Sequence, residues 1–298
     1  MSYTLNSKDL SVYGLYPSHA PSSNISLEGC FSMPIRIGDT HYIWAEEDYV
    51  QPYVDADELF FAGRDITLYA NMFGSKGDIN YNLRVLYEDL KAFTDLVTLS
   101  TPYGDFSVYV QNIDIELVGK ITKAARVVIH FREPVVTLDG TLPSTGTALW
   151  TIDSIPLSSF GLYVSSDSLN SFPSLQEQFF TKYGSEHYQV CRRGESTIII
   201  NGFVTASSVE NFKTNVSNLY KLFSSSGERS LKVIHPVTIK CFAKNGFTIS
   251  NVFVFDNLVI GNFSIELTKS SSTDEGFYYL VTEDSEYVLT EETDKILI

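Results

Sequence analysis

The chain has 298 residues, of which 36 are acidic and 21 are lysine or arginine, so its formal net charge is -15. This charge argues against a protein that grips nucleic acid, because affinity for phosphate comes from clustered cations. The length fits two domains of ordinary size, and the hydrophobic content of 44% is normal for a globular chain. We therefore expect two packed domains with a negative surface.

The cysteines and the N-terminus bear on the compartment. Cys30, Cys191 and Cys241 form no CxxC pair, and so sparse a set is not a disulfide framework. The first residues, MSYTLNSKDL, lack the basic and apolar regions of a signal peptide, and no run in the chain predicts a membrane span. We therefore expect synthesis in a reducing cytoplasm and no membrane partner.

Alternation of apolar and polar residues dominates the first half of the chain. Residues 59–73 place Ile66, Leu68 and Ala70 on one face, which predicts a half-buried strand. The next segment, 82–97, has helical spacing and predicts one amphipathic helix, with an apolar stripe of Leu83, Leu86, Tyr87, Leu90, Phe93 and Val97. Alternation then returns and predicts strands at 106–110, 113–117 and 124–133, with a hairpin tip at Gly119.

The second half repeats this order of elements. Residues 194–204 predict a strand, and a helix follows in which Ser207 and Glu210 fit a capping box. Three further strands are expected, at 230–242, 247–255 and 258–268, with hairpin turns at Asn245-Gly246 and Asp256-Asn257. In this alignment Leu90 of the first helix corresponds to Leu219 of the second, and Phe93 corresponds to Leu222.

A short motif also occurs in both halves. Residues 10–16 read LSVYGLY and residues 157–163 read LSSFGLY, about half the chain apart. An internal repeat of this kind predicts a duplicated domain. We therefore expect a mainly β fold of the α+β class, with two tandem β-sandwich or β-barrel domains that each carry one helix.

Composition sets the predicted boundaries of these domains. The first domain is expected at 1–134 and the second at 153–269, joined by a turn-rich linker at 135–152. The last segment, 270–298, is strongly acidic and repeats YLVTEDSE as YVLTEETD. It is either a short β-arm that adds to a neighbouring sheet or a frayed acidic tail.

No motif for catalysis, phosphate binding or metal binding occurs in the sequence. The histidines are scattered, and His130 lies in an apolar strand, where we expect a structural, hydrogen-bonded side chain. A carboxylate-pair hydrolase would use Asp55 and Asp57, but nothing marks a substrate site. We therefore expect no enzyme, no cofactor and no metal.

Three sets of residues are candidates for a binding role. A dense group of acids forms either a solvated loop, a calcium site or an anionic wall that repels DNA: Glu46, Glu47, Asp48, Asp55, Asp57 and Glu58. Aromatic residues beside it are either core and interface side chains or a surface that stacks on glycans: Tyr42, Trp44, Tyr49 and Tyr53. Arginines that precede corresponding strands pair with acids either of a neighbouring subunit or of the same chain: Arg64, Arg192 and Arg193.

The order of these features resembles the distal tail and tail-tube family of long-tailed bacteriophages. The matching features are the LxxYGL segment, an aromatic and acidic loop with Trp44, the stretch FFAGRDITLYA at 60–70, one helix, and a meander that ends in IHFREP. The resemblance implies a β-sandwich or barrel flanked by a helix. It also implies that six copies of the domain form a ring around a DNA channel with an acidic lumen.

The resemblance further implies a non-enzymatic structural protein of the virion tail. Such a protein is either the distal adaptor between tail tube and baseplate or the tube itself, and it contacts other tube, hub or baseplate proteins. DNA would pass through without specific binding. The second half departs from the usual distal tail protein because it looks like another tube domain, which implies either a trimer that mimics a hexamer or a hexamer. The alternative is a glycan- or receptor-binding module.

Overall fold

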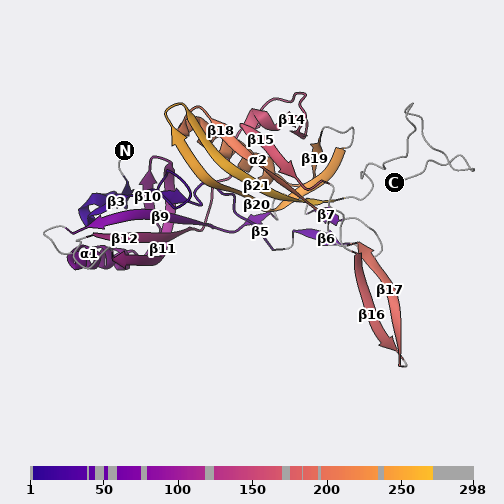
Figure 1. Cartoon of the computed structure of the whole chain (residues 1–298), viewed down its shortest axis with the longest axis horizontal. Coiled ribbons are helices and arrows are strands. Elements are labelled where there is room, and N and C mark those ends of the chain that lie inside the picture. The colour runs from indigo at the N-terminus through magenta and orange to yellow at the C-terminus, as the bar shows by residue number, and fades with distance from the viewer. Residues whose placement is uncertain are drawn as a thin grey trace, which may run out of the picture.

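The structure is a computed structural model that describes residues 3–38, 40–43, 50–52, 59–74, 79–117, 124–169, 175–182, 184–193, 196–233 and 238–270. Over these ranges the fold is mainly β, with two large curled antiparallel sheets and two α-helices (Figure 1). The expectation of a mainly β chain with two helices is confirmed. Neither α-helix in the described ranges is long and apolar enough to span a membrane.

The first sheet is built from the N-terminal half of the chain. Its strands run in the order β2 (Lys8–Asp9), β1 (Thr4–Leu5), β10 (Val97–Thr101), β11 (Gly104–Leu117), β12 (Ala124–Glu133), β9 (Arg64–Phe73) and β3 (Leu15–Pro17), and β4 (Leu27–Glu28) also pairs with β9. A short 3₁₀ helix, η1 (Leu10–Tyr13), precedes β3, and helix α1 (Ile79–Ala92) follows β9. The predicted inward residues of β9, Ile66, Leu68 and Ala70, are fully buried.

The second sheet has the same strand order. It runs β14 (Ile155–Pro156), β13 (Thr151–Ile152), β19 (Arg229–Lys232), β20 (Thr238–Phe255), β21 (Leu258–Lys269), β18 (Thr197–Ala206) and β15 (Leu162–Asp167). The 3₁₀ helix η4 (Leu157–Phe160) precedes β15, and helix α2 (Val209–Ser224) follows β18. Each strand of this sheet therefore has a counterpart at the same place in the first sheet.

The repeated LSxxGLY motif has the same conformation in both halves. A two-residue turn precedes it, with positive φ at both central residues of Asn6-Ser7 and of Asp153-Ser154, as a tight hairpin requires. The motif itself forms a 3₁₀ helix that ends at Gly14 (φ 68°) or Gly161 (φ 66°). The sequence repeat thus marks a hairpin, a single turn of helix and the start of an edge strand.

A three-point clasp joins the motif to the long strand and the helix in each half. The glycine carbonyl accepts a hydrogen bond from a backbone N–H of the strand, and the carbonyl of that strand residue accepts one from a helix asparagine. The residues are Gly14, Phe73 and Asn82 in the first half, and Gly161, Thr205 and Asn215 in the second. A Cβ on either glycine would collide with the strand carbonyl, so only glycine fits both the space and the positive φ.

The clasp corrects the predicted alignment of the two helices. Because Asn82 corresponds to Asn215, Leu86 corresponds to Leu219 and Tyr87 to Tyr220. The expected pairing of Leu90 with Leu219 was therefore wrong by about one helical turn, and so was that of Phe93 with Leu222. The first helix is also displaced from the predicted 82–97, because α1 ends at Ala92 and Val97 begins strand β10.

Several predicted boundaries in the meanders were also wrong. Asn245-Gly246 is not a hairpin turn but a bulge inside β20, where the register shifts between Ala243 and Phe247. In the same way, β11 is one strand with a shift near Val110 rather than two strands. The predicted turn at Asp256-Asn257 is confirmed, since it joins β20 to β21.

The start of α2 differs by one residue from the prediction. Ser208, rather than Ser207, is the N-cap, and its hydroxyl accepts a hydrogen bond from the backbone N–H of Asn211. The hydroxyl of Ser207 instead accepts a hydrogen bond from the side-chain amide of Asn211. The expected Gly119 tip, between β11 and β12, lies outside the described residues.

The predicted linker at 135–152 contacts the second half, and the division of the chain into two domains stays a prediction. It lies against α2, where the Thr141 N–H donates to the Asn218 side chain at 2.8 Å, and β13 begins inside it at Thr151. The buried apolar side chains of both sheets form one continuous cluster. Of the predicted acidic arm, only Ser270 is described.

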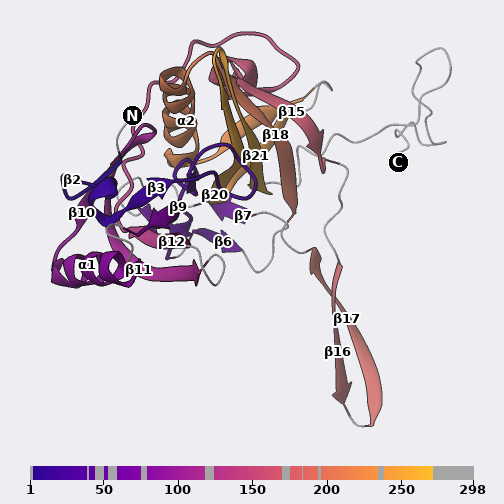
Figure 2. The ribbon, with the colours of Figure 1, turned by 60° about the vertical axis from the view of Figure 1, so that its left-hand side comes forward.

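Smaller two-stranded pairs extend from the sheets. They are β5 (Arg36–Ile37) with β8 (Phe60–Phe61), β6 (His41–Ile43) with β7 (Val50–Pro52), and β16 (Leu175–Lys182) with β17 (Ser185–Arg193). The β16–β17 hairpin projects away from the rest of the molecule in both views (Figures 1 and 2).

Candidate assembly interface

The main candidate site is the contact between the two halves, where the connection from β3 to β9 crosses onto the second sheet. Strand β19 is short and pairs with only the first residues of β20, which leaves the next part of that edge without a strand partner. Buried backbone groups need hydrogen bonds, and the crossing segment supplies them. The Asn24 side chain donates to the Val254 carbonyl and accepts from the Val254 N–H, both at 2.7 Å, and the Met33 N–H donates to the Phe247 carbonyl at 2.8 Å.

The crossing segment also covers helix α2. The ring of Phe31 meets Phe212 edge to face, with centroids 5.1 Å apart, and beside it the Ser32 hydroxyl accepts from the Ile249 N–H at 3.1 Å. Beneath the helix, Tyr220 stacks on Phe247 at 5.4 Å. Aromatic pairs in these geometries add to the free energy gained from burial alone.

Arg64, at the start of β9, ties the first sheet to α2. Its Nε donates to Glu133 Oε2 at 2.6 Å, and its Nη1 donates to the Tyr220 hydroxyl at 2.7 Å and to the Ser32 carbonyl at 3.3 Å. The guanidinium also lies over the ring of Phe106 at 5.5 Å. Arg64 therefore has an acidic partner within the chain, while a contact with a neighbouring subunit stays a prediction.

Burial sets the protonation of this group of side chains. Burial raises the pKa of Glu133, although the neighbouring Arg64 partly offsets this by favouring the charged carboxylate. Burial also raises the pKa of Tyr220 to about 12. Burial alone would lower the pKa of Arg64, but Tyr220 and Glu133 raise it above its ordinary value. At neutral pH the arginine thus stays charged and holds Glu133 of the first half and Tyr220 of the second.

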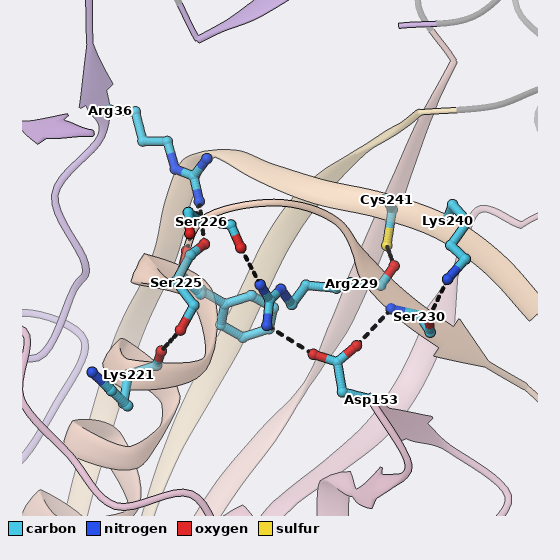
Figure 3. A network of polar contacts seen from close by, with 10 residues as sticks. Arg36, Asp153, Lys221, Ser225, Ser226, Arg229, Ser230, Lys240 and Cys241 are labelled. Atoms are coloured by element: carbon cyan, nitrogen blue, oxygen red, sulfur yellow. Dashed lines mark hydrogen bonds and ion pairs between the residues drawn. The ribbon is translucent and has the colours of Figure 1, made fainter. Parts of the chain in front are cut away.

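A second arginine from the first half lies at the C-terminal end of α2 (Figure 3). The Nη2 of Arg36 donates to the carbonyls of Phe223 at 3.0 Å and Ser225 at 3.2 Å. A cation is favourable at this end of a helix, because the unpaired carbonyls carry partial negative charge. Burial, together with nearby Arg229, lowers the pKa of Arg36 to about 10.

Arg229 completes this network from the second sheet. It donates to Asp153 at 2.9 Å and to the Ser226 carbonyl, while Asp153 also accepts from the Ser230 N–H at 2.8 Å (Figure 3). Asp153 belongs to the hairpin turn of the repeated motif. The network therefore joins the start of the second half to the end of α2.

Most of the other predicted site residues lie outside the described ranges. These are the acids Glu46, Glu47, Asp48, Asp55, Asp57 and Glu58 and the aromatics Trp44, Tyr49 and Tyr53. Tyr42 lies in β6, and Arg192 and Arg193 lie at the end of β17, but the surroundings of these three side chains are not described. Their proposed roles stay predictions.

The structure adds residues that the sequence did not indicate. Asn24, Arg36 and Tyr220 make contacts across the two halves, and Glu133 holds Arg64, which reaches Tyr220 from the first half. The one local signal was Arg36, a lone cation in the apolar run MPIRI. Such a cation is buried only with hydrogen-bond acceptors nearby.

The described residues also bear on catalytic and metal chemistry. His130 has the structural role that the sequence predicted, since its ring nitrogens lie 2.9 Å from Asp114 Oδ2 and 3.3 Å from Thr67 Oγ1. Burial raises the pKa of the Cys30 and Cys241 thiols to about 12, so both stay protonated and unreactive at neutral pH. Within the described ranges, no three metal-binding side chains gather at one point.

No protein-family model matches the chain, and no curated protein sequence matches it. Among solved structures, it is similar to the crystal structure of the SPP1 Dit (gp 19.1) protein, described as a paradigm of the hub adsorption apparatus in phages that infect Gram-positive bacteria. The TM-score is 0.34 and the identity 14%, over 90% of this chain and 98% of that one. At this level the likeness carries no argument about function, which has to come from the chain's own residues.

Proposed function

We propose that this chain is a structural, non-enzymatic protein of a bacteriophage tail, in which it forms a ring around the DNA channel. The ring is either the distal adaptor between tail tube and baseplate or part of the tube. The observation that carries the proposal is that two halves with the same strand order and one helix each contact one another in a directional way. The resemblance of FFAGRDITLYA and its flanking elements to phage tail proteins supports the same assignment.

The contact between the halves is directional because each half uses a different surface. The first half contributes its β3–β9 connection and Arg64, whereas the second contributes α2 and the edge of β20. Contacts of this head-to-tail kind, repeated from unit to unit, close into rings or continue as filaments. Two tandem units in one chain would supply two neighbouring positions of such a ring.

The charge of the chain suits a channel for DNA. A net charge of -15 repels phosphate groups, so DNA can pass without being held. The acids between 46 and 58 are the proposed lumen residues. In this role the protein would be made in the bacterial cytoplasm and assemble there with other tube, hub or baseplate proteins, without a membrane.

The test is the mass of the purified full-length protein over a wide range of concentrations, by sedimentation and native mass spectrometry. The proposal expects a trimer or hexamer of the 33.4 kDa chain, or longer stacks of these. A strict monomer at every concentration would contradict it. A glycan array separates the alternative: saturable binding that is lost in Trp44→Ala would favour a glycan-binding module.

The absence of catalysis is tested separately with the two candidate carboxylates. The proposal expects no glycoside hydrolysis by the wild-type protein, and therefore no difference in Asp55→Asn or Asp57→Asn. Hydrolysis by the wild type that disappears in Asp55→Asn would show an enzyme instead.

A further inference from the structure

Equivalent residues of the two halves can be identified from the clasp and the strand registers. Counting from Asn82 and Asn215 makes Tyr87 the counterpart of Tyr220. Counting along the paired strands makes Ile115 the counterpart of Ile249, since their cross-strand partners, Val127 and Phe263, face equivalent residues of β9 and β18. The same counts pair Leu90 with Phe223 and Ile113 with Phe247.

These equivalent residues differ sharply in exposure. Tyr220 and Ile249 have exposed fractions of 6% and 4%, whereas Tyr87 and Ile115 have 64% and 48%. Leu90 and Ile113 are partly buried, while their counterparts are fully buried. We call the surface formed by Tyr87, Leu90, Ile113 and Ile115 the open face.

The edge of the neighbouring strand shows the same difference. In the described part of the chain, β10 pairs with β11 only as far as Val108, and no hydrogen bond is recorded along that edge beyond it. The corresponding edge of β20 is bonded by Asn24, Ser32 and Met33. An edge of this kind is a ready site for an added segment of chain.

The segment that covers this face in the second half comes from the first half, and the second half has a corresponding segment of its own. In the first half, residues 24–36 of the β3–β9 connection cross onto α2 and β20. In the second half the corresponding connection, from β15 to β18, carries the β16–β17 hairpin, which points away from the molecule (Figures 1 and 2). Each chain therefore holds one covered face, one open face, one connection in use and one that extends outward.

We propose that the open face binds a second copy of this chain, through that copy's β16–β17 hairpin. This contact repeats between chains the one that already exists within the chain. It rests on the proposed ring and deepens it, because the two halves would then alternate around one ring. A ring of six units, as the resemblance implies, would contain three chains.

The first experiment compares the assembly of two variants by native mass spectrometry of the full-length chain. Tyr87→Asp with Ile115→Asp places two charges on the open face and should abolish oligomers, because a buried unpaired charge is unfavourable. Leu149→Asp, at an apolar residue that is 65% exposed elsewhere, is the matched control and should assemble like the wild type. Equal thermal melting of both variants as dilute monomers shows that each is folded.

The second experiment tests the direction of the contact by mixing. A variant in which residues 175–193 are replaced by a short Gly-Ser turn keeps the open face but lacks the hairpin. It should be monomeric alone, and should form a one-to-one dimer, and nothing larger, with the Tyr87→Asp, Ile115→Asp variant. Failure of these two variants to combine would overturn the proposal.

The outcomes separate this inference from the proposed function. If the wild type forms rings and the Tyr87→Asp, Ile115→Asp variant forms the same rings, the open-face contact is overturned but the proposed ring function stands. A wild-type chain that stays monomeric at every concentration would overturn both.

Discussion

Helices α1 and α2 occupy equivalent places in two sheets of identical strand order, yet one is exposed and the other buried. Six apolar residues of α2 are buried, but only Ile79 and Leu86 of α1 are. The difference does not come from the fold of either half, since the clasp that holds each helix is the same. It comes from the crossing segment, Arg64 and the segment around Thr141, which in the described part of the chain lie against α2 and not against α1. Burial of an amphipathic helix in a repeated unit is thus set by its neighbour.

The largest expected effect is at Arg64, which pairs with Glu133 inside the first half and bonds Tyr220 of the second. Arg64→Ala leaves Glu133 buried without its partner and should lower the free energy of unfolding by about 3–5 kcal/mol. Arg132→Ala is the matched control, because its pair with Asp65 is exposed, and it should cost about 0–1 kcal/mol. Urea denaturation measures both. Equal costs would contradict the burial of the Arg64 contacts.

The next effect compares the two equivalent tyrosines directly. Tyr220→Ala removes a buried ring stacked on Phe247 and should cost about 3–5 kcal/mol. Tyr87→Ala, measured in dilute monomer, should change stability by about 0.5 kcal/mol or less, since its side chain is mostly exposed. A large loss for Tyr87→Ala would mean that α1 is covered within the chain.

The clasps should be affected equally in the two halves. Asn82→Ala and Asn215→Ala each remove one hydrogen bond to a strand carbonyl, and each should cost about 1–2 kcal/mol. Thermal unfolding of the two single variants checks this. If only one substitution has an effect, the two clasps are not equivalent.

The smallest effect at neutral pH concerns the buried thiols, one from each half. Burial raises the pKa of Cys30 and Cys241 from 9.0 to about 12 in the folded chain. The unfolded chain therefore releases these protons first, so stability is fully present below pH 9 and falls as the pH rises toward 12. Denaturation between pH 7 and 11 should show this fall, and it should be smaller in Cys30→Ala with Cys241→Ala. An unchanged slope in that variant would show that other groups cause the fall.

Much of the fold could be predicted from local pattern. Period-two alternation located β9 and β12, and helical spacing located both helices, because each pattern reflects one buried face. The Asn245-Gly246 turn was misread, since a turn signal does not reveal that the partner strand continues past it. The helix alignment failed because an apolar stripe recurs at every turn, so a shift of one turn matches it equally well, and only the clasp asparagines fix the alignment.

The candidate site was harder to predict, for a physical reason. Asn24, Arg36 and Arg64 act on partners more than a hundred residues away, and a single sequence carries no signal for such contacts. The stripe of α1 likewise predicts a buried helix but does not say which molecule buries it. The predicted lumen and glycan residues between 42 and 58 remain predictions, because the structure does not describe those side chains.

The most direct test of the account is an electron micrograph of the purified full-length protein, with the repeats counted in class averages. Because the two halves share one strand order and one directional contact, we predict a ring of alternating, nearly equal units around a central channel. Three chains should appear as six such units. A population made only of monomers, or of dimers joined face to face, would contradict the account.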